Sequence, residues 1–426
     1  MITTAIIAEF NPFHNGHAYL FERAKALTNA DRLVVVMSGD FVQRGEPAIM
    51  DKHLRARIAL DCGADLVLEL PVCYATASAE YFAYGAVTLL DRLGTIDYLC
   101  FGSETGDLTM LSEVADILCE EPALYQEELN RQLKCGNAFP VARKLALATY
   151  LKQTTSPDNT AFANGDMSFL DTPNNILALE YLKALKKQHS SIKPVTVKRT
   201  DSGYHSNALT EETGFASASA LRALFSEHAS ASDSNLWSQM AAFVPKTALP
   251  ILTEAFYHAY PVLPADFDQM LQYKLMMEDD FTIYLDVTGD FHDKLMKYRT
   301  QFQSSAQFIH SLKSKDLTFT RISRMLSHIL LGITKAEMDA FINGDVTYYA
   351  TMLALSKSAS DLTGAIKANS KLPLISSASK AERILTKNAL KQFQKDLQTA
   401  HLYESVVARK FGQEMQSEYT RMLISQ

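Results

Sequence analysis

The first half of the chain alternates short apolar runs with longer segments of helical periodicity. The apolar runs are bounded by turn residues, which is typical of strands buried on both faces. They lie at residues 2–8, 32–37, 65–70, 97–101 and 194–198. The segments with helical periodicity lie at residues 16–28, 51–62, 77–93 and 174–187. Because strands alternate with helices, the pattern predicts an α/β fold with a doubly wound parallel sheet.

This alternation is interrupted twice. Residues 108–150 carry helical periodicity alone, so we expect a helical insertion there. After about residue 237 the strand pattern fades, and helical periodicity dominates at residues 291–312, 321–331 and 379–401. A chain of 426 residues is too long for one ordinary core. We therefore predict an α/β domain at residues 1–235 and an α-helical domain at residues 236–426.

Composition narrows the class of protein. Hydrophobic residues make up 47% and charged residues 21% of the chain, as in globular proteins. No apolar run has the length of a membrane span, and the first residues lack a signal-peptide pattern, so we expect a cytoplasmic protein with no membrane partner. The five cysteines have no Cys-x-x-Cys spacing. We expect buried thiols, without a metal site or disulfides.

The net charge of -7 is unevenly distributed. From Phe291 onward there are 19 Lys and Arg against 11 Asp and Glu, a net charge of +8, which leaves -15 for the preceding residues. A basic segment on an acidic protein suggests a polyanionic partner. The surface of an ordinary helical bundle would explain the same count equally well.

The first apolar run leads directly into His14-Asn15-Gly16-His17 at the start of a predicted helix. A helix N-terminus binds anions, and a glycine lets a phosphate approach the backbone closely. The two imidazoles are therefore candidate catalytic groups that stabilise charge during displacement at phosphorus. The same two histidines would also suit a metal site or an exposed helix face, but their place after a buried strand favours phosphate chemistry.

Polar loops follow other predicted strands. After the second strand, Ser38, Asp40, Gln43 and Arg44 form a candidate substrate loop, because a guanidinium binds carboxylate or phosphate bidentately. A capped loop without a ligand is the alternative. Gly102 follows the fourth strand and permits close approach of a ligand, although a plain turn glycine is as good an explanation.

Two further groups suit a nucleotide. Asn174 and Asn175 begin a predicted helix, where one asparagine suffices as a cap and the other is available to a base or ribose. Arg199 and Thr200 end the last strand. Ser219 and Arg222 follow in a Ser-x-Ser-x-x-Arg pattern that suits a second phosphate site, although capped helices often carry such a pattern.

Basic residues recur at helical spacing in the C-terminal part. Arg321 and Arg324 lie beside apolar positions of one predicted helix. Further along the chain, one predicted cationic stripe comprises Lys380, Arg383, Lys387, Lys391 and Lys395. Stripes with few acids suit the phosphates of a nucleic acid, although most charge runs are solvated helix faces.

The motifs together resemble those of one family. His-x-Gly-His with a later Ser-x-Ser-x-x-Arg resembles the nucleotidylyltransferase superfamily, whose catalytic domain is Rossmann-like. The segments that occur here in the order found in the tRNA(Met) cytidine acetate ligases are IIAEFNPFHNGH, SGDFVQRGEPA, DLVLELP, FGSE, PNNILALEYLKAL, KR…GYH and ASASALR. The resemblance extends over nearly the whole chain.

This resemblance implies an enzyme that uses ATP and acetate to form acetyl-adenylate. The acetyl group then passes to N4 of the wobble cytidine of elongator tRNA(Met), giving N4-acetylcytidine. Mg²⁺ is expected with ATP. The ATP site would comprise Ile7, Ala8, Glu9, Phe10, Asn11, Pro12, Phe13, His14, Asn15, Gly16, His17, Ala18, Tyr19, Leu20, Gly102, Asn174 or Asn175, Arg199 and Thr200. Ser219 and Arg222 would hold phosphate by analogy with the superfamily.

Two other functions fit the same motifs. A small-molecule nucleotidylyltransferase that adenylylates a phosphorylated metabolite would use the same histidines, but it would not require a basic helical domain. An ATP-binding RNA adaptor would bind both ligands without turnover. No stable protein partner is indicated by the sequence.

Overall fold

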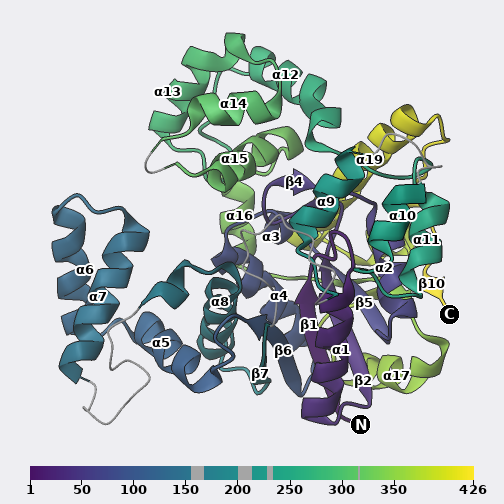
Figure 1. The fold of residues 1–426 in the computed structure, drawn as a ribbon, viewed down its shortest axis with the longest axis horizontal. Helices are drawn as coiled ribbons and strands as arrows, with labels where there is room; N and C mark the ends of the chain where they lie inside the picture. The colour runs from purple at the N-terminus through teal and green to yellow at the C-terminus, as the bar shows by residue number, and fades with distance from the viewer. Residues whose placement is uncertain (155–166, 200–213, 228–233, 315–316) are drawn as a thin grey trace.

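A mostly parallel sheet forms the centre of the computed structural model, which describes residues 1–154, 167–199, 214–227, 234–314 and 317–426. Five of its strands are parallel: β1 (Thr3–Ala8), β2 (Arg32–Ser38), β5 (Leu66–Leu70), β6 (Tyr98–Ser103) and β7 (Lys193–Lys198). Their spatial order is β5-β2-β1-β6-β7, so the chain changes direction across the sheet at β1 (Figure 1). The predicted doubly wound α/β fold is confirmed.

Helices cover both faces of this sheet because successive strand residues point to opposite sides. Ile6 packs in one apolar cluster with α1 (Asn15–Thr28), α2 (Lys52–Asp61), α9 (Ala218–Glu227), α10 (Ser234–Met240) and α11 (Ala248–Ala255). Ala5 and Ile7 pack in the other with α3 (Val72–Ala75), α4 (Ala79–Leu93) and α8 (Pro173–Lys187). Burial on both faces explains why each strand is an unbroken apolar run.

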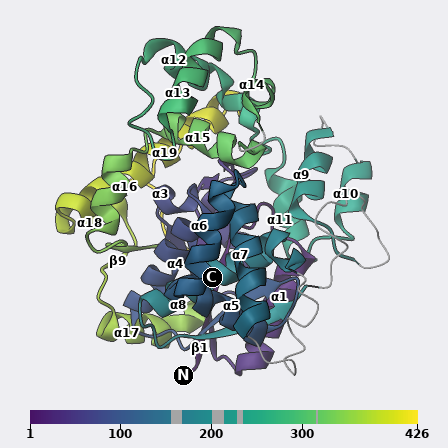
Figure 2. The same ribbon diagram turned by 90° about the vertical axis from the view of Figure 1, so that its left-hand side faces the viewer.

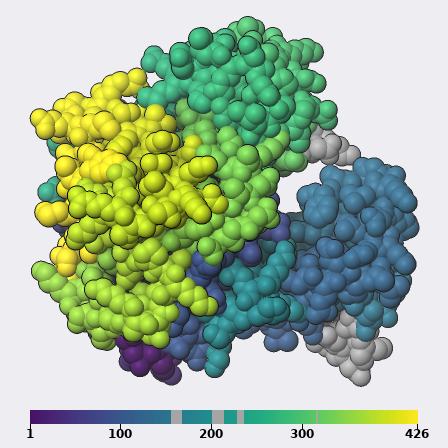
Figure 3. Space-filling view, turned by 180° about the vertical axis from the view of Figure 1, so that it is seen from behind, coloured from purple at the N-terminus to yellow at the C-terminus, as the bar shows by residue number. Residues whose placement is uncertain are grey.

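The predicted helical insertion is an arm of three helices, α5 (Leu108–Glu120), α6 (Ala123–Lys134) and α7 (Phe139–Thr154). The arm projects from one side of the sheet, at the left of Figure 1. A second helical unit, α12 (Asp268–Met277), α13 (Gly289–Tyr298), α14 (Ser305–Leu312) and α15 (Phe319–Leu331), has its own apolar core above the sheet. Seen from behind, the surface is hollowed between the two units (Figure 3).

The C-terminal part is not wholly helical, which corrects the prediction for residues 236–426. After α16 (Lys335–Ile342), strand β8 (Ala350–Leu355) pairs antiparallel with β5, and β9 (Leu374–Ile375) and β10 (Ile424–Ser425) pair with β8. Because β8 stands between helical segments, without the strand–helix alternation of the first half, the sequence pattern did not reveal it. α17 (Ser360–Asn369) lies between β8 and β9.

The segment 379–401, which carries helical periodicity throughout, is divided between two helices in the structure. α18 (Ala378–Ile384) ends before Leu385, and α19 (Lys387–Phe411) begins after Thr386.

A small hairpin, β3 (Phe41–Val42) and β4 (Glu46–Pro47), lies in the loop after β2. All five cysteines are free, and Cys135 is exposed, contrary to the expectation of buried thiols. No helix in the described ranges is long and apolar enough to cross a membrane.

Candidate active site

A cavity of about 240 Å³ opens at the carboxyl ends of the strands, where ligands bind in doubly wound sheets. It lies over β1 and takes residues from the loops of β2, β6 and β7. The predicted site residues that line it are Ile7, Ala8, Glu9, Phe10, Asn11, His14, Gly16, His17, Tyr19, Leu20, Gln43, Arg44, Gly102, Asn174 and Arg199. Residues separated by nearly two hundred positions in the sequence thus share one cavity.

The tautomers of both catalytic candidates are fixed by the backbone of α1. Gly16 N–H donates to His14 Nδ1 at 3.0 Å, and His14 N–H donates to His17 Nδ1 at 3.2 Å. Because each Nδ1 is an acceptor, each neutral ring carries its proton on Nε2. The rings stack with centroids 3.8 Å apart. The motif therefore presents two aligned N–H donors.

Both imidazoles are neutral at pH 7. Burial lowers the pKa of His14 to about 3, assisted by the positive charges of Arg199 and Arg222. Burial, the neighbouring His14 and Arg199 hold the pKa of His17 well below its ordinary value. The rings are thus hydrogen-bond donors toward an anion, and proton transfer is not their task at neutral pH.

The start of α1 is held against the rest of the molecule by residues of the motif that do not line the cavity. Asn15 N–H donates to Phe243 O at 2.8 Å, and its side chain donates to Gly214 O at 2.9 Å. A side chain at Gly16 would come within 2.9 Å of the His14 ring. The other predicted ATP-site residues of this loop that do not line the cavity are Pro12, Phe13 and Ala18.

The structure distinguishes the two asparagines at the start of α8. Asn174 lines the cavity. Asn175 is fully buried, where its Oδ1 accepts from Glu104 N–H at 3.0 Å and its Nδ2 donates to Phe169 O at 3.1 Å. Glu104 in turn accepts from the Asn174 side chain at 2.7 Å. Asn175 therefore fastens the β6 loop to α8, and Asn174 is the member of the pair available to a ligand.

Only some of the residues predicted to form a second phosphate site line the cavity. Arg199 lines the cavity together with Lys198, the residue before it in the Lys-Arg pair that ends the strand. Arg222 donates to Asn11 O at 2.8 Å and to Ser219 Oγ at 3.2 Å, so both residues support the loop after β1 from outside the cavity lining. Thr200 lies outside the described residues.

Only two of the four residues of the candidate substrate loop line the cavity. Gln43 and Arg44 line the cavity, and Gln43 N–H donates to Glu9 Oε1 at 2.9 Å. Ser38 and Asp40 are buried and do not line it. Asp40 accepts from Lys52 N–H at 2.7 Å, and burial raises its pKa to about 6. Asp40 is therefore bonded to the start of α2, and contact of Ser38 and Asp40 with a substrate stays a prediction.

Arg55 on α2 supports the loops of the site, and the sequence pattern did not reveal this role. It is fully buried, and its guanidinium donates to Met50 O at 3.0 Å, Glu9 O at 2.7 Å and Ser38 O at 2.9 Å. It also donates to the carbonyl of the next residue, Gly39. These bonds join the ends of β1 and β2, so Arg55 holds the two loops together from outside the cavity lining.

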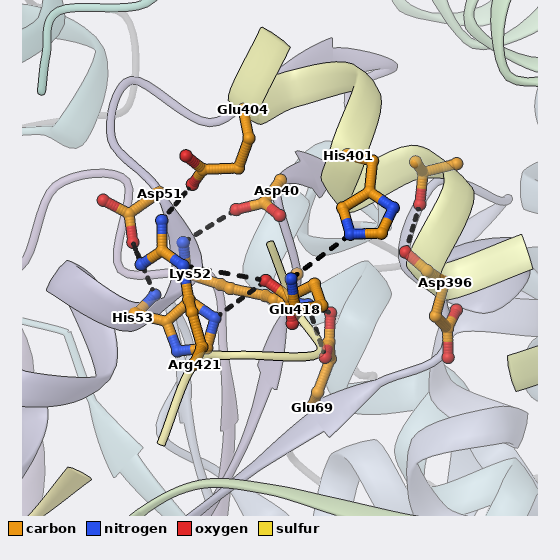
Figure 4. Close-up of polar contacts among 12 residues, drawn as sticks. Asp40, Asp51, Lys52, His53, Glu69, Asp396, His401, Glu404, Glu418 and Arg421 are labelled. Carbon is orange, nitrogen blue, oxygen red and sulfur yellow. Dashed lines mark hydrogen bonds and ion pairs between the residues drawn. The ribbon is translucent and has the colours of Figure 1, made fainter. Parts of the chain in front are cut away.

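A buried ionic cluster lies around Lys52 at the start of α2 (Figure 4). Lys52 Nζ is 2.9 Å from Glu69 and 3.1 Å from Glu418, and His53 Nε2 is 3.0 Å from Glu418. Arg421 pairs with Glu404 of α19. The segment that follows α19 is thus tied to the start of α2, whose Lys52 N–H also donates to Asp40 in the loop after β2.

The predicted nucleic-acid residues do not form one surface. Arg321 is exposed and Arg324 half-buried on α15, where Ser323 Oγ donates to Gly45 O at 2.9 Å, beside Arg44. Gly45 has φ +73°, and a side chain there would collide with the backbone of α15. Arg321 and Arg324 therefore lie next to the loop that reaches the cavity.

The other basic residues lie elsewhere. The exposed members of the predicted stripe are Lys380, Arg383, Lys387 and Lys391. They belong to α18 and the start of α19, and α18 lies on the opposite side of the molecule from α9 in Figure 2. Lys395 is half-buried and donates to Gly332 O at 2.7 Å, so it ties α19 to the end of α15 and is not part of an exposed stripe.

The chain matches the family model of the HIGH nucleotidyl transferases over residues 1–418. It is 38% identical over 404 residues to the tRNA(Met) cytidine acetate ligase of Halothermothrix orenii, covering 93% of this chain and 92% of that protein. It is 40% identical over 399 residues to that of a Thermoanaerobacter species, covering 93% and 94%.

Solved structures agree with these sequence matches. The crystal structure of Thermotoga maritima TmcAL bound with alpha-thio ATP superimposes with a TM-score of 0.88 at 29% identity, covering 100% of this chain and 99% of that one. The apo form gives a TM-score of 0.90 at the same identity and coverage. The chain belongs to the HIGH nucleotidyl transferase family and, within it, to the tRNA(Met) cytidine acetate ligases.

Proposed function

We propose that this chain is an ATP-dependent ligase that acetylates N4 of the wobble cytidine of elongator tRNA(Met). The observation that carries the proposal is the pair of neutral imidazole N–H donors at the start of α1, inside the cavity at the switch point of the sheet. That arrangement suits displacement at a phosphate. The named relatives supply the substrates.

In the first step, a carboxylate oxygen of acetate attacks the α-phosphorus of ATP, and pyrophosphate leaves. The Nε2–H groups of His14 and His17 donate to the phosphate oxygens on which charge accumulates, and the dipole of α1 adds to this stabilisation. Arg199 and Lys198 bring positive charge to the same cavity. No covalent intermediate on the protein is required.

In the second step, the cytidine amine attacks the acyl carbon of acetyl-adenylate, and AMP leaves. The base must be unstacked to reach the cavity, as in most sequence-specific RNA recognition. We assign Arg321 and Arg324 to the RNA backbone, because α15 packs on the loop that carries Arg44.

Magnesium is expected as the counter-ion of the triphosphate and therefore as part of the substrate. Across the described ranges, no group of three or more His, Cys, Asp or Glu side chains is placed to hold a metal ion.

The test is to incubate the purified protein with ATP, labelled acetate and total bacterial tRNA, and to digest the recovered RNA to nucleosides. Label in N4-acetylcytidine that requires ATP is the expected result. Pyrophosphate release that depends on a phosphorylated metabolite, and is indifferent to acetate, would instead favour a small-molecule nucleotidylyltransferase.

A further inference from the structure

The charges that line the cavity include one that does not suit a triphosphate. Among the described lining residues, Arg44, Lys198 and Arg199 are cations, and Glu9 is the only carboxylic acid. A carboxylate beside ATP repels the phosphates and weakens binding. Glu9 therefore has a use that the nucleotide does not explain.

Glu9 stands at the centre of the cavity, between the residues that come from β6 and β7 and those that come from the loop after β2. β2 and β6 flank β1 on opposite sides. The candidate nucleotide residues Gly102, Asn174 and Arg199 come from the side of β6 and β7. Glu9 follows β1, and its Oε1 accepts from Gln43 N–H in the loop after β2. Its carboxylate is thus bonded to the loop that carries Gln43 and Arg44, across the cavity from Gly102, Asn174 and Arg199.

One oxygen of this carboxylate is held and the other is available. Oε1 accepts the Gln43 bond at 2.9 Å, whereas within the described part of the chain Oε2 has no hydrogen-bond partner. Burial and then the Glu9 carboxylate raise the pKa of Tyr181, which also lines the cavity, so the two groups are close. Glu9 is therefore anchored in the cavity with one free acceptor.

The second half-reaction needs such an acceptor. When the N4–carbon bond forms, the amine nitrogen becomes positive and must lose a proton before the product is stable. The two histidines are poor candidates, because their Nδ1 atoms are occupied by backbone N–H groups and their Nε2 atoms carry protons. A carboxylate that also stabilises the developing ammonium suits this role.

We propose that Glu9 is the catalytic base of acetyl transfer. Its carboxylate accepts a hydrogen bond from N4 of cytidine and takes the proton as the N4–acyl bond forms. The bond between the acyl carbon and the phosphate oxygen breaks, and AMP leaves with the electron pair. Glu9 then releases the proton to solvent. This inference rests on the proposed function, because it assigns a residue to the second step of that reaction.

The test separates the two half-reactions in Glu9→Gln, which keeps the shape of the side chain and an oxygen for Gln43 N–H. Acetyl-adenylate formation is measured by acetate-dependent exchange of pyrophosphate into ATP, and by trapping with hydroxylamine, a strong nucleophile that needs no base. Transfer is measured as N4-acetylcytidine formed in a single turnover. Glu22→Gln, which removes an exposed carboxylate of α1, is the matched control.

We expect transfer to fall by about 100-fold or more in Glu9→Gln, and adenylation and hydroxamate formation to fall by much less than transfer. Glu9→Asp, which keeps the charge one methylene further back, should recover part of the transfer rate. An equal loss in both half-reactions, or an increased Mg²⁺ requirement for adenylation, would overturn the inference, since either result would make Glu9 an ATP-site or metal-site residue.

Unchanged transfer in a folded Glu9→Gln protein would also overturn it. A wild-type protein that makes acetyl-adenylate but no N4-acetylcytidine would overturn the proposed function and this inference together. If Glu9→Gln does not fold, Glu9→Asp decides, because a base displaced by a methylene must slow transfer while adenylation continues.

Discussion

At the scale of single residues, the imidazoles of His14 and His17 do their work as neutral donors. Replacing His17 by Ala removes one Nε2–H from the cavity and one acceptor from the backbone of α1. Since loss of one such donor costs about 10²–10³ in rate, we expect acetate-dependent pyrophosphate exchange to fall by about that factor. His14→Ala should behave similarly.

The fold of both variants should be retained, as judged by circular dichroism. His258→Ala, at an exposed site, is the control for loss of an imidazole. Full exchange activity in His17→Ala would remove the imidazoles from the mechanism.

The lowered pKa of His14 also makes a prediction about stability. Between its unfolded value near 6.5 and its folded value of about 3, the unfolded chain binds a proton that the folded chain does not. The folded state therefore loses stability as the pH falls below 6.5, by about 2 kcal/mol from this group alone at pH 5.

His14→Asn keeps a side-chain acceptor for Gly16 N–H and removes the titrating group. Urea unfolding at pH 7 and pH 5 should show a smaller pH-dependent loss in this variant than in the wild-type protein. The same loss in both proteins would mean that His14 is not held neutral in the folded state.

At the scale of elements, two basic surfaces are candidates for binding RNA: α15 and the start of α19. We expect Arg321→Ala with Arg324→Ala to weaken tRNA binding. The slope of log affinity against log salt should become shallower by about 0.7–0.9 for each RNA phosphate that the variant no longer binds. Acetate-dependent pyrophosphate exchange should be unaffected.

The double variant Lys387→Ala with Lys391→Ala is the matched comparison for the α15 pair, since both lysines are exposed and belong to the predicted cationic stripe. If that pair changes the salt dependence and the α15 pair does not, the RNA crosses the face on which α18 lies. If neither pair matters, both are solvated helix surfaces.

The strands also show which parts of the fold the sequence pattern predicts and which it does not. β1, β2, β5, β6 and β7 were predicted because each strand is buried on both faces and forms an apolar run. β8 was missed because it enters the sheet from a helical region and pairs antiparallel with β5. The histidine motif was predictable because strand, turn and helix start are local. Arg55 was not, because its four carbonyl acceptors are brought to it by the tertiary fold.

At the scale of the whole molecule, the ionic cluster of Figure 4 joins distant parts of the chain. Lys52 lies between Glu69 and Glu418. Because removing one member of a buried ion pair leaves charge uncompensated, Lys52→Met should destabilise the protein by about 3–5 kcal/mol near pH 8. The loss should be smaller at pH 5, where the two carboxyls of the variant, whose pKa values rise without Lys52, are closer to protonation.

Urea unfolding of Lys52→Met, Glu418→Gln and the double variant tests this cluster. We expect the double variant to be less destabilised than the sum of the single variants. Strict additivity would mean that the two groups do not interact in solution.

The pairing of β10 with β8, which itself pairs with β5, has a consequence for biosynthesis. The ribosome makes the catalytic motif first and the strand that closes this edge of the sheet hundreds of residues later. Until residues 418–425 emerge, the nascent chain must hold β8 without its β10 neighbour and Lys52 with Glu69 as its partner but without Glu418. This edge of the sheet and the ionic cluster can therefore be completed only after translation has passed residues 418–425.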